Sequence, residues 1–278
     1  MLTFNAFGGA DKVPTGTYTD HSPNSSKYDT SDILKFSWDH TLQSEDSFYI
    51  DETIPMCLTD KKSNKKYGWL LESKAIIPSV YEDFKKNINL YMEKLDLVFT
   101  SDYELYSLHE QIKFAPANTL WVKYPKLYKK DKLISMISSS HSVTLGHQLR
   151  LDLINKYKNQ IDIYGRQINP IPMKEFGLKK YMFSFAIENS SYKTYFTEKI
   201  LDCFATGTIP IYWGAPDIGE HFNLDGIIIF DENFDINMLS EDFYYSKMNA
   251  IKDNYDRAIH YQVLENYIYD RYLNEKKN

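Results

Sequence analysis

The chain has little cysteine, and it lacks the short phosphate-binding motifs that identify many nucleotide-binding proteins. Its 278 residues include two cysteines, Cys57 and Cys203, which lie far apart and match no metal-binding spacing. Cys203 falls in an apolar helical pattern, so we expect it to be a buried free thiol. The glycine patterns GxGxxG after a strand and GxxxxGK[ST] do not occur either. These absences exclude a small disulfide-built secreted domain and a phosphate site made by a glycine-rich loop.

Long apolar runs and an excess of positive charge are also missing. No window approaches the roughly 18 apolar residues of a membrane span, and the first residues lack the basic start and apolar run of a signal peptide. The net charge is −6 with an isoelectric point near 5.7, so no global field attracts nucleic acid. We therefore expect a cytoplasmic protein, or one held peripherally on the cytosolic face of a membrane, with no nucleic-acid partner.

The residues that are present indicate a globular α/β protein. Hydrophobic residues make up 43% of the chain and charged residues 25%, enough for real cores. Short apolar runs alternate with stretches of helical spacing in both halves, a pattern typical of parallel sheets. Residues 1–30 show no clear period and are predicted to be loop without a first strand. The pattern predicts an N-terminal Rossmann-like domain at residues 1–125, a second one at 126–255, and a C-terminal helix at 256–278 that crosses back to the first.

One stretch, AIENSSYKTYFTEKILDCFATGTIPIYWG at residues 186–214, combines a strand–helix–strand pattern with a crowd of polar residues at its first joint. A buried strand should end near Glu188, Thr197 is a good helix N-cap, and Gly207 suits the position just after the helix. Ligands of open α/β sheets bind at the carboxyl ends of strands, and a helix N-terminus favours phosphate. The joint is thus a candidate ligand site, formed by Glu188, Asn189, Ser190, Tyr195, Glu198 and Lys199.

The chemistry of the joint favours a nucleotide over a free phosphate. Lys199 would supply positive charge to phosphate oxygens, whereas Glu198 would repel a bare phosphate and accept well from the vicinal hydroxyls of a ribose. A purely structural role stays open, because a glutamate in the first turn stabilises any helix by about 0.3–1 kcal/mol. Arg150 follows a polar loop in the next predicted helix upstream, and its fork also suits phosphate. His141 and His147 are interpreted as loop residues.

This stretch, with ENS, YxTEK and IPIYWG in order, resembles the donor-binding signature of the α1,3-fucosyltransferase family, especially its bacterial members. The resemblance covers about residues 130–230 well and the first half weakly. It implies the GT-B architecture, in which two Rossmann-like domains face each other across a cleft, and an inverting transfer from GDP-fucose without a metal cofactor. Arg150 and Lys199 would hold the pyrophosphate, Glu198 the ribose hydroxyls, and Asn189 and Tyr195 the phosphates or the sugar. The absence of any DxD motif agrees with a site that uses fixed cations in place of a metal.

An inverting transfer also needs a carboxylate that removes a proton from the acceptor hydroxyl. Glu72, at the end of the strand in KYGWLLESK, is our candidate for this base, and it loosely resembles the family's acid-bearing loop. Rivals are Glu52, Asp39 and Asp102. An exposed loop carboxylate without a catalytic role is the alternative for Glu72.

The family's acceptor residues lie in variable regions, so the acceptor cannot be transferred by resemblance beyond its class. We expect a glycan or lipid-linked oligosaccharide as acceptor, GDP-fucose or a related GDP-deoxysugar as donor, and at most peripheral membrane contact. Two other hypotheses remain. One is a nucleotide-sugar-binding protein that has lost its activity, and the other is a structural module with the tyrosine-rich tail as a homodimer surface.

Overall fold

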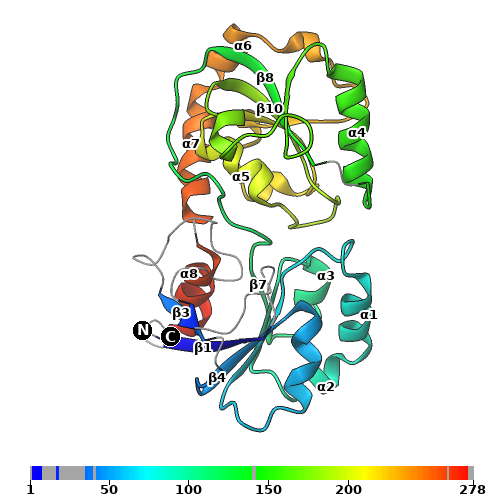
Figure 1. Ribbon diagram of the computed structural model, residues 1–278, viewed down its shortest axis with the longest axis vertical. Helices are drawn as coiled ribbons and strands as arrows, with labels where there is room; N and C mark the ends of the chain where they lie inside the picture. Colours follow the sequence, from blue (N-terminus) through cyan, green and yellow to red (C-terminus); the bar gives the residue numbers. More distant parts are fainter. Residues whose placement is uncertain are drawn as a thin grey trace. The chain divides into compact units, whose positions relative to one another are not determined.

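The computed structural model describes residues 2–7, 17–18, 35–39, 42–139, 142–261 and 263–274. The chain forms two compact units (Figure 1): unit 1 comprises Met1–Thr119 and Val263–Asn278, and unit 2 comprises Leu120–Gln262. The sequence placed the boundaries after residues 125 and 255, whereas the structure places them after 119 and 262. The C-terminal segment therefore belongs to unit 1.

Unit 1 is built on a seven-stranded sheet of order β2-β3-β1-β4-β5-β6-β7. Neighbouring strands pair in parallel except β2 with β3, which are antiparallel. The parallel arrangement agrees with the predicted α/β class. The strands are β1 (Leu2–Phe7), β2 (Thr17–Tyr18), β3 (Phe36–Asp39), β4 (Asp46–Ile50), β5 (Lys66–Leu70), β6 (Leu97–Thr100) and β7 (Ile112–Phe114).

Alternating side chains of this sheet supply two separate cores. On one face, Phe48 and Trp69 pack with α8 (Leu264–Ile268), whose two end residues are fully buried. On the other face, Tyr49 and Leu70 pack with α1 (Pro78–Lys86) and α2 (Ile88–Met92). The two-residue period of a strand thus places successive residues in different cores. The 3-10 helix η2 (Asp51–Leu58) follows β4, the short helix α3 (Tyr103–Tyr106) follows β6, and the π-helix η8 (Tyr269–Leu273) follows α8.

The prediction that the first 30 residues lack a strand is wrong. β1 lies inside the sheet between β3 and β4, and only part of residues 8–34 falls within the described chain. The strand was missed because the polar residue Asn5 interrupts its short apolar run. Asn5 is buried, and its side chain donates to the Ser44 carbonyl and to the Ser47 hydroxyl. Buried polar groups that are fully bonded in this way cost little, but a pattern of apolar residues does not reveal them.

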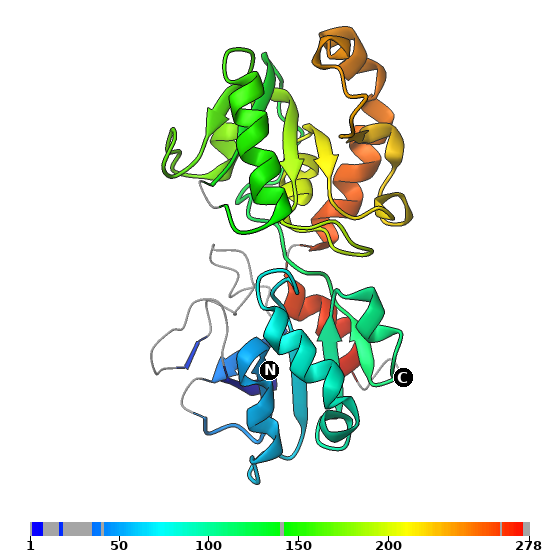
Figure 2. The same cartoon turned by 90° about the vertical axis from the view of Figure 1, so that its right-hand side faces the viewer.

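Unit 2 has a five-stranded, all-parallel sheet of order β12-β11-β10-β8-β9. Helix α5 packs on one face, against the core that contains Ala186 and Tyr212. Helix α4 packs on the other face, with Phe183 and Phe185 (Figure 2). The main elements are β8 (Lys132–Ile137), α4 (Leu145–Tyr157), β9 (Asp162–Tyr164), η3 (Lys174–Gly177), β10 (Tyr181–Ile187), α5 (Glu198–Ala205), β11 (Ile209–Trp213), β12 (Ile228–Ile229), α6 (Glu241–Ser246) and α7 (Met248–Ala258).

The residues predicted to begin and end α5 are confirmed. Thr197 is its N-cap, and the Thr197 hydroxyl accepts a bond from the Lys199 N–H. Gly207 follows the C-cap with a φ of 71°, a left-handed conformation that glycine adopts without a steric penalty. Cys57 and Cys203 are both free and buried. Among the described residues, no helix is both long and apolar enough to span a bilayer.

Candidate functional site

The carboxyl end of β10 meets the start of α5 through the buried side chain of Glu188. One oxygen of this carboxylate accepts from the Thr197 N–H at 2.8 Å, and the other accepts from the Thr197 hydroxyl at 2.7 Å. Lys199 Nζ lies 3.4 Å from the same carboxylate. Burial raises the pKa of Glu188 above its ordinary value, although Lys199 and Thr197 act in the opposite direction. Glu188 therefore fixes the start of α5, and its predicted contact with a ligand stays a prediction.

Two glycines, Gly146 and Gly214, allow other parts of the chain to approach the carboxyl end of β10 closely. A Cβ at Gly146 would lie 1.7 Å from the Glu188 carbonyl oxygen, and a Cβ at Gly214 would lie 2.2 Å from the Tyr212 hydroxyl. The Gly146 N–H also donates to the Asn189 carbonyl at 3.1 Å. The first turn of α4 is thus pressed against the joint, which only glycine permits at this separation.

Arg150 and Asn189, both predicted from the sequence, are brought together by this close approach. The Arg150 side chain is buried, its Nε donates to the Gly146 carbonyl at 3.1 Å, and its terminal nitrogen donates to the Asn189 amide oxygen. Burial lowers the pKa of Arg150, while the nearby Glu188 and Glu198 act against the shift. A guanidinium held this way keeps further N–H donors in a fixed fork that matches phosphate oxygens.

The acid and the lysine at the start of α5 form the charged part of the site. Glu198 is buried, and one of its oxygens lies 3.3 Å from Lys199 Nζ and 3.3 Å from Lys174 Nζ. Burial alone would raise the pKa of Glu198, but the two lysines and the Thr197 hydroxyl bring it well below its usual range. Glu198 is therefore an ionised hydrogen-bond acceptor at neutral pH, the state that a diol-binding role requires.

Lys174 and Asp202 belong to this cluster but were missed by the sequence analysis. Asp202 is buried one turn after Glu198 on α5, and its carboxylate lies 3.0 Å from Lys174 Nζ. Burial raises the pKa of Asp202 to about 6, with Lys174 opposing the shift. The i,i+4 spacing of the two acids places them on one helix face, and two buried acids on one face need a cation. The i,i+4 spacing of the two acids was the available signal in the sequence, but it does not identify the lysine that pairs with them.

The loop between β10 and α5 contains the remaining predicted residues. Ser190 is half-buried there, and Tyr195 is buried with its ring stacked on Tyr192 at a centroid distance of 4.5 Å. Thr194 has a φ of 64°, and its N–H donates to both oxygens of Asp217 at 2.9 and 3.1 Å. A β-branched residue in the left-handed region is strained, and such strain often accompanies functional sites.

In unit 1, the candidate base Glu72 lies two residues after the end of β5 and is exposed. Its backbone is held by Asp51, which follows the neighbouring strand β4. The Asp51 carboxylate accepts from the Leu71 N–H at 2.8 Å and from the Glu72 N–H at 3.2 Å. Asp51 has a φ of 49° and is buried, and burial raises its pKa to about 7. The sequence pattern indicated Glu52 at this strand end but gave no signal for its buried neighbour Asp51.

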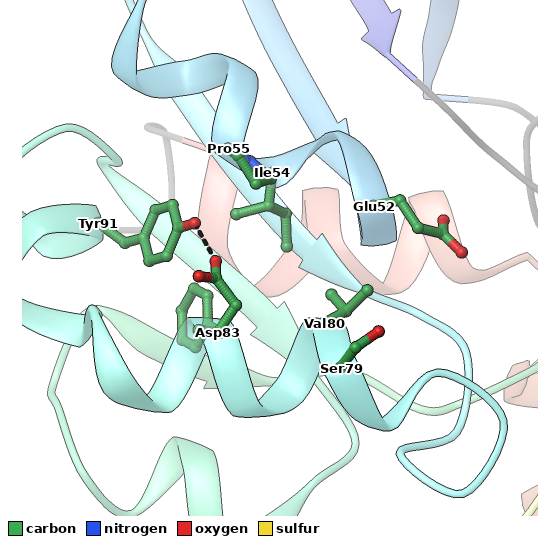
Figure 3. A pocket seen from close by; sticks show the side chains of 8 residues that line it. Glu52, Ile54, Pro55, Ser79, Val80, Asp83 and Tyr91 are labelled. Carbon is green, nitrogen blue, oxygen red and sulfur yellow. Dashed lines mark hydrogen bonds between the residues drawn. The ribbon is translucent and has the colours of Figure 1, made fainter.

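The three rivals for the base have other surroundings. The Asp39 carboxylate accepts from the Gln43 N–H at 2.9 Å, and Asp102 caps α3 and pairs with Lys74 at 2.9 Å. Glu52 lies at the rim of a cavity of about 160 Å³ between η2 and α1 (Figure 3). In the figure its carboxylate points away from Ile54, Asp83 and Tyr91, which line the same cavity. Glu52 and Glu72 are thus both exposed beyond the ends of the paired strands β4 and β5, and Glu72 as the base stays a prediction.

Two predictions concern histidines and metals. His141 lies outside the described residues. His147 lies in the first turn of α4 and not in a loop. Its ring nitrogen Nδ1 forms a hydrogen bond with the hydroxyl of the N-cap residue Thr144 at 2.9 Å. In the part of the chain that the structure describes, no three His, Cys, Asp or Glu side chains group in a way that could hold a metal ion.

Residues 127–239 match the family model of glycosyltransferase family 10 (fucosyltransferase) C-term. Over 126 residues the chain is 36% identical to an α-(1,3)-fucosyltransferase, FucT, of Helicobacter pylori, a match that covers 45% of this chain and 23% of that protein. Over 108 residues it is 31% identical to a putative fucosyltransferase-like protein of Arabidopsis thaliana, covering 36% of this chain and 21% of that one. The chain thus spans less than a quarter of the length of these curated relatives.

Solved structures align with a larger part of the chain at lower sequence identity. A crystal structure of an α1,3-fucosyltransferase aligns with 82% of this chain and 73% of that chain, at a TM-score of 0.48 and 15% identity. The structure of TarM aligns with 82% of this chain and 54% of that chain, at a TM-score of 0.48 and 16% identity.

Proposed function

Because residues 127–239 match the C-terminal domain of the family 10 fucosyltransferases, we propose that the protein is an inverting glycosyltransferase. It would move fucose, or a related deoxysugar, from a GDP-sugar to a hydroxyl group of a glycan or lipid-linked oligosaccharide. The observation that supports this most is the grouping of Arg150, Asn189, Glu198 and Lys199 around the carboxyl end of β10.

Each of these side chains suits one part of a nucleoside diphosphate. Arg150 is buried and fixed by the Gly146 carbonyl, so it loses little freedom when it binds a phosphate oxygen. Lys199 and the N-terminus of α5 add positive charge beside it. Glu198 is ionised and accepts hydrogen bonds, which matches the two hydroxyl groups of a ribose.

In the proposed reaction, the acceptor oxygen attacks the anomeric carbon of the sugar from the face opposite the diphosphate. The new C–O bond forms as the bond from the anomeric carbon to the phosphate oxygen breaks, and the transition state has oxocarbenium character. Glu72 takes the proton from the acceptor hydroxyl, and GDP leaves with the bonding electron pair. Arg150 and Lys199 stabilise the charge that develops on the leaving diphosphate, which is the work a metal ion does in other glycosyltransferases.

A binding panel with GDP- and UDP-sugars, with and without a chelator, tests the donor half of the proposal. A ligand that saturates the site at 100 times its dissociation constant should raise the free energy of unfolding by about 2.7 kcal/mol. We expect GDP and GDP-fucose each to raise the melting temperature, and each shift should be the same with and without the chelator. A shift only with a UDP-sugar and manganese would contradict the proposal.

Turnover separates an active enzyme from an inactive binding protein. GDP release from GDP-fucose should be measured with a mixture of glycan acceptors and, separately, with water alone. Binding of GDP-fucose without transfer or hydrolysis would indicate a nucleotide-sugar-binding protein. Absence of any nucleotide binding would leave only a structural role for the cluster.

A further inference from the structure

Lys174 links Glu198, the acid proposed to bind the ribose, to a segment that lies before the motif at residues 186–214. It lies at the start of η3, and its Nζ is 3.3 Å from a Glu198 oxygen and 3.0 Å from an Asp202 oxygen. The same ammonium lies over the ring of Trp121, 4.4 Å from the ring centroid. Only 21% of the lysine side chain is exposed, and the two acids are almost completely buried.

The residues around Trp121 are themselves firmly held. In the connector segment, Trp121–Tyr124, four consecutive backbone N–H groups donate to two buried carboxylates. One Asp202 oxygen accepts from Trp121 at 2.7 Å and from Val122 at 3.1 Å, and one Glu175 oxygen accepts from the next two residues. The connector segment, η3 and α5 therefore form one bonded unit in which the position of Asp202 is fixed.

This arrangement leaves Lys174 little freedom. Burial alone would lower its pKa, but Asp202 and Glu198 raise it above the ordinary value, so the side chain stays charged. A charged lysine held between a fixed acid and an aromatic ring orients the third group that it touches, which is Glu198. Lys199 also touches Glu198, at the same oxygen, but it is shared with Glu188.

We propose that Lys174 is a positioning residue for nucleotide binding: it holds the Glu198 carboxylate in the orientation that accepts bonds from the two ribose hydroxyls. This rests on the proposed function, because it assumes that Glu198 binds the ribose of the donor. It adds that recognition of the ribose depends on a lysine that lies before β10, in a segment tied to the connector. Trp121 is then a neighbour of the site, because Lys174 contacts both the Trp121 ring and the Glu198 carboxylate.

The experiment compares Lys174→Met with the unaltered chain, using GDP and 2′,3′-dideoxy-GDP as probes in calorimetric titrations. Methionine keeps the length of the side chain and removes its charge. Because Lys174 acts on the ribose hydroxyls through Glu198, the variant should bind GDP about tenfold more weakly. Its affinity for 2′,3′-dideoxy-GDP, which lacks both hydroxyl groups, should change less than about twofold, since those bonds are absent in both proteins.

Two matched variants complete the design. Lys174→Arg restores a cation between Glu198 and Asp202 and should bring the GDP affinity back to within about threefold of the unaltered chain. Lys180→Met removes an exposed lysine nearby, whose side chain is 56% exposed, and should leave both affinities unchanged. An equal loss for GDP and its dideoxy analogue in Lys174→Met would indicate general damage and overturn the proposal, and so would an unchanged GDP affinity.

Fluorescence gives a second readout that a purely structural role would not produce. Trp213 ends β11 next to Glu188, so both proteins in this experiment carry Trp213→Phe. In that background GDP should change the tryptophan emission, and adding Trp121→Phe should abolish most of that change while calorimetry still detects binding. A GDP-induced change that persists in Trp121→Phe contradicts the link through Lys174. If GDP does not bind the unaltered chain at all, the proposed function fails and this inference fails with it. If GDP binds normally and only the Lys174 results disagree, the proposed function stands.

Discussion

Asp51 should make the stability of the protein depend on pH, and replacing it with asparagine should remove that dependence. The carboxylate is buried at the end of β4, and burial raises its pKa from 3.8 to about 7. The folded state therefore binds this proton more tightly than the unfolded state does. The resulting stabilisation is fully present below pH 3.8 and is lost as the pH rises through 7.

The size of the effect follows from the pKa difference. A shift of about 3 units corresponds to about 4 kcal/mol at 1.36 kcal/mol per unit, which is an upper limit for this single group. In the variant, the asparagine side chain would keep an oxygen that accepts from the Leu71 and Glu72 N–H groups, and asparagine tolerates the left-handed φ of 49°. Asp51→Asn should thus equal the unaltered chain near pH 4 and exceed its free energy of unfolding at pH 8.

Urea unfolding at pH 4, 5, 6, 7 and 8 measures this difference. Glu52→Gln, which removes one exposed carboxylate from the same strand end, controls for the loss of a negative charge. Parallel stability curves for Asp51→Asn and the unaltered chain across this range would refute the reasoning, because no proton would then be bound more tightly on folding.

Three further substitutions test the rest of the structure. Gly146→Ala should lower the free energy of unfolding by about 1–3 kcal/mol and weaken GDP binding, because its Cβ would lie 1.7 Å from a backbone carbonyl; Gly219→Ala, whose methyl meets only a flexible side chain, should cost less in the same urea assay. Glu72→Gln should fold and bind GDP-fucose but lose about 10²–10⁴ in transfer rate, and unchanged turnover would remove Glu72 from the role of base. Tyr91→Phe, which loses the hydroxyl bond to Asp83 shown in Figure 3, should cost about 1 kcal/mol in thermal unfolding, and an unchanged melting temperature would contradict this.

Elements with local signals were predictable from the sequence. The helical spacing at residues 145–157 coincides with α4, and Thr197 and Gly207 mark the two ends of α5 as expected. These signals lie within a few residues of the feature they specify, because caps and C-terminal glycines act on adjacent backbone groups. The contact between Arg150 and Asn189 is less local, and the resemblance implied only that both residues belong to the donor site.

Features that depend on distant partners were not predictable in the same way. Asn5 lies in a strand because Ser44 and Ser47 satisfy its amide, and Asp51 is buried because the end of β5 supplies two N–H groups to its carboxylate. A pattern of single residues contains no information about such pairings. At the end of β4 the pattern indicated Glu52, as a rival to Glu72 for the base, whereas the fold buries the neighbouring Asp51.

The charges at the proposed donor site show why a motif alone describes a site incompletely. Within the motif, Glu188, Glu198 and Asp202 contribute three buried acids, and Lys199 is the motif cation that contacts two of them. Such a cluster would repel a diphosphate. Lys174 and Arg150, which lie upstream of the motif, bring the formal count of cations to three and so balance the acids. The attraction for a diphosphate must then come from the placement of the cations and of the helix N–H groups, and not from net positive charge. For this reason an acidic chain with a net charge of −6 is compatible with a nucleotide site.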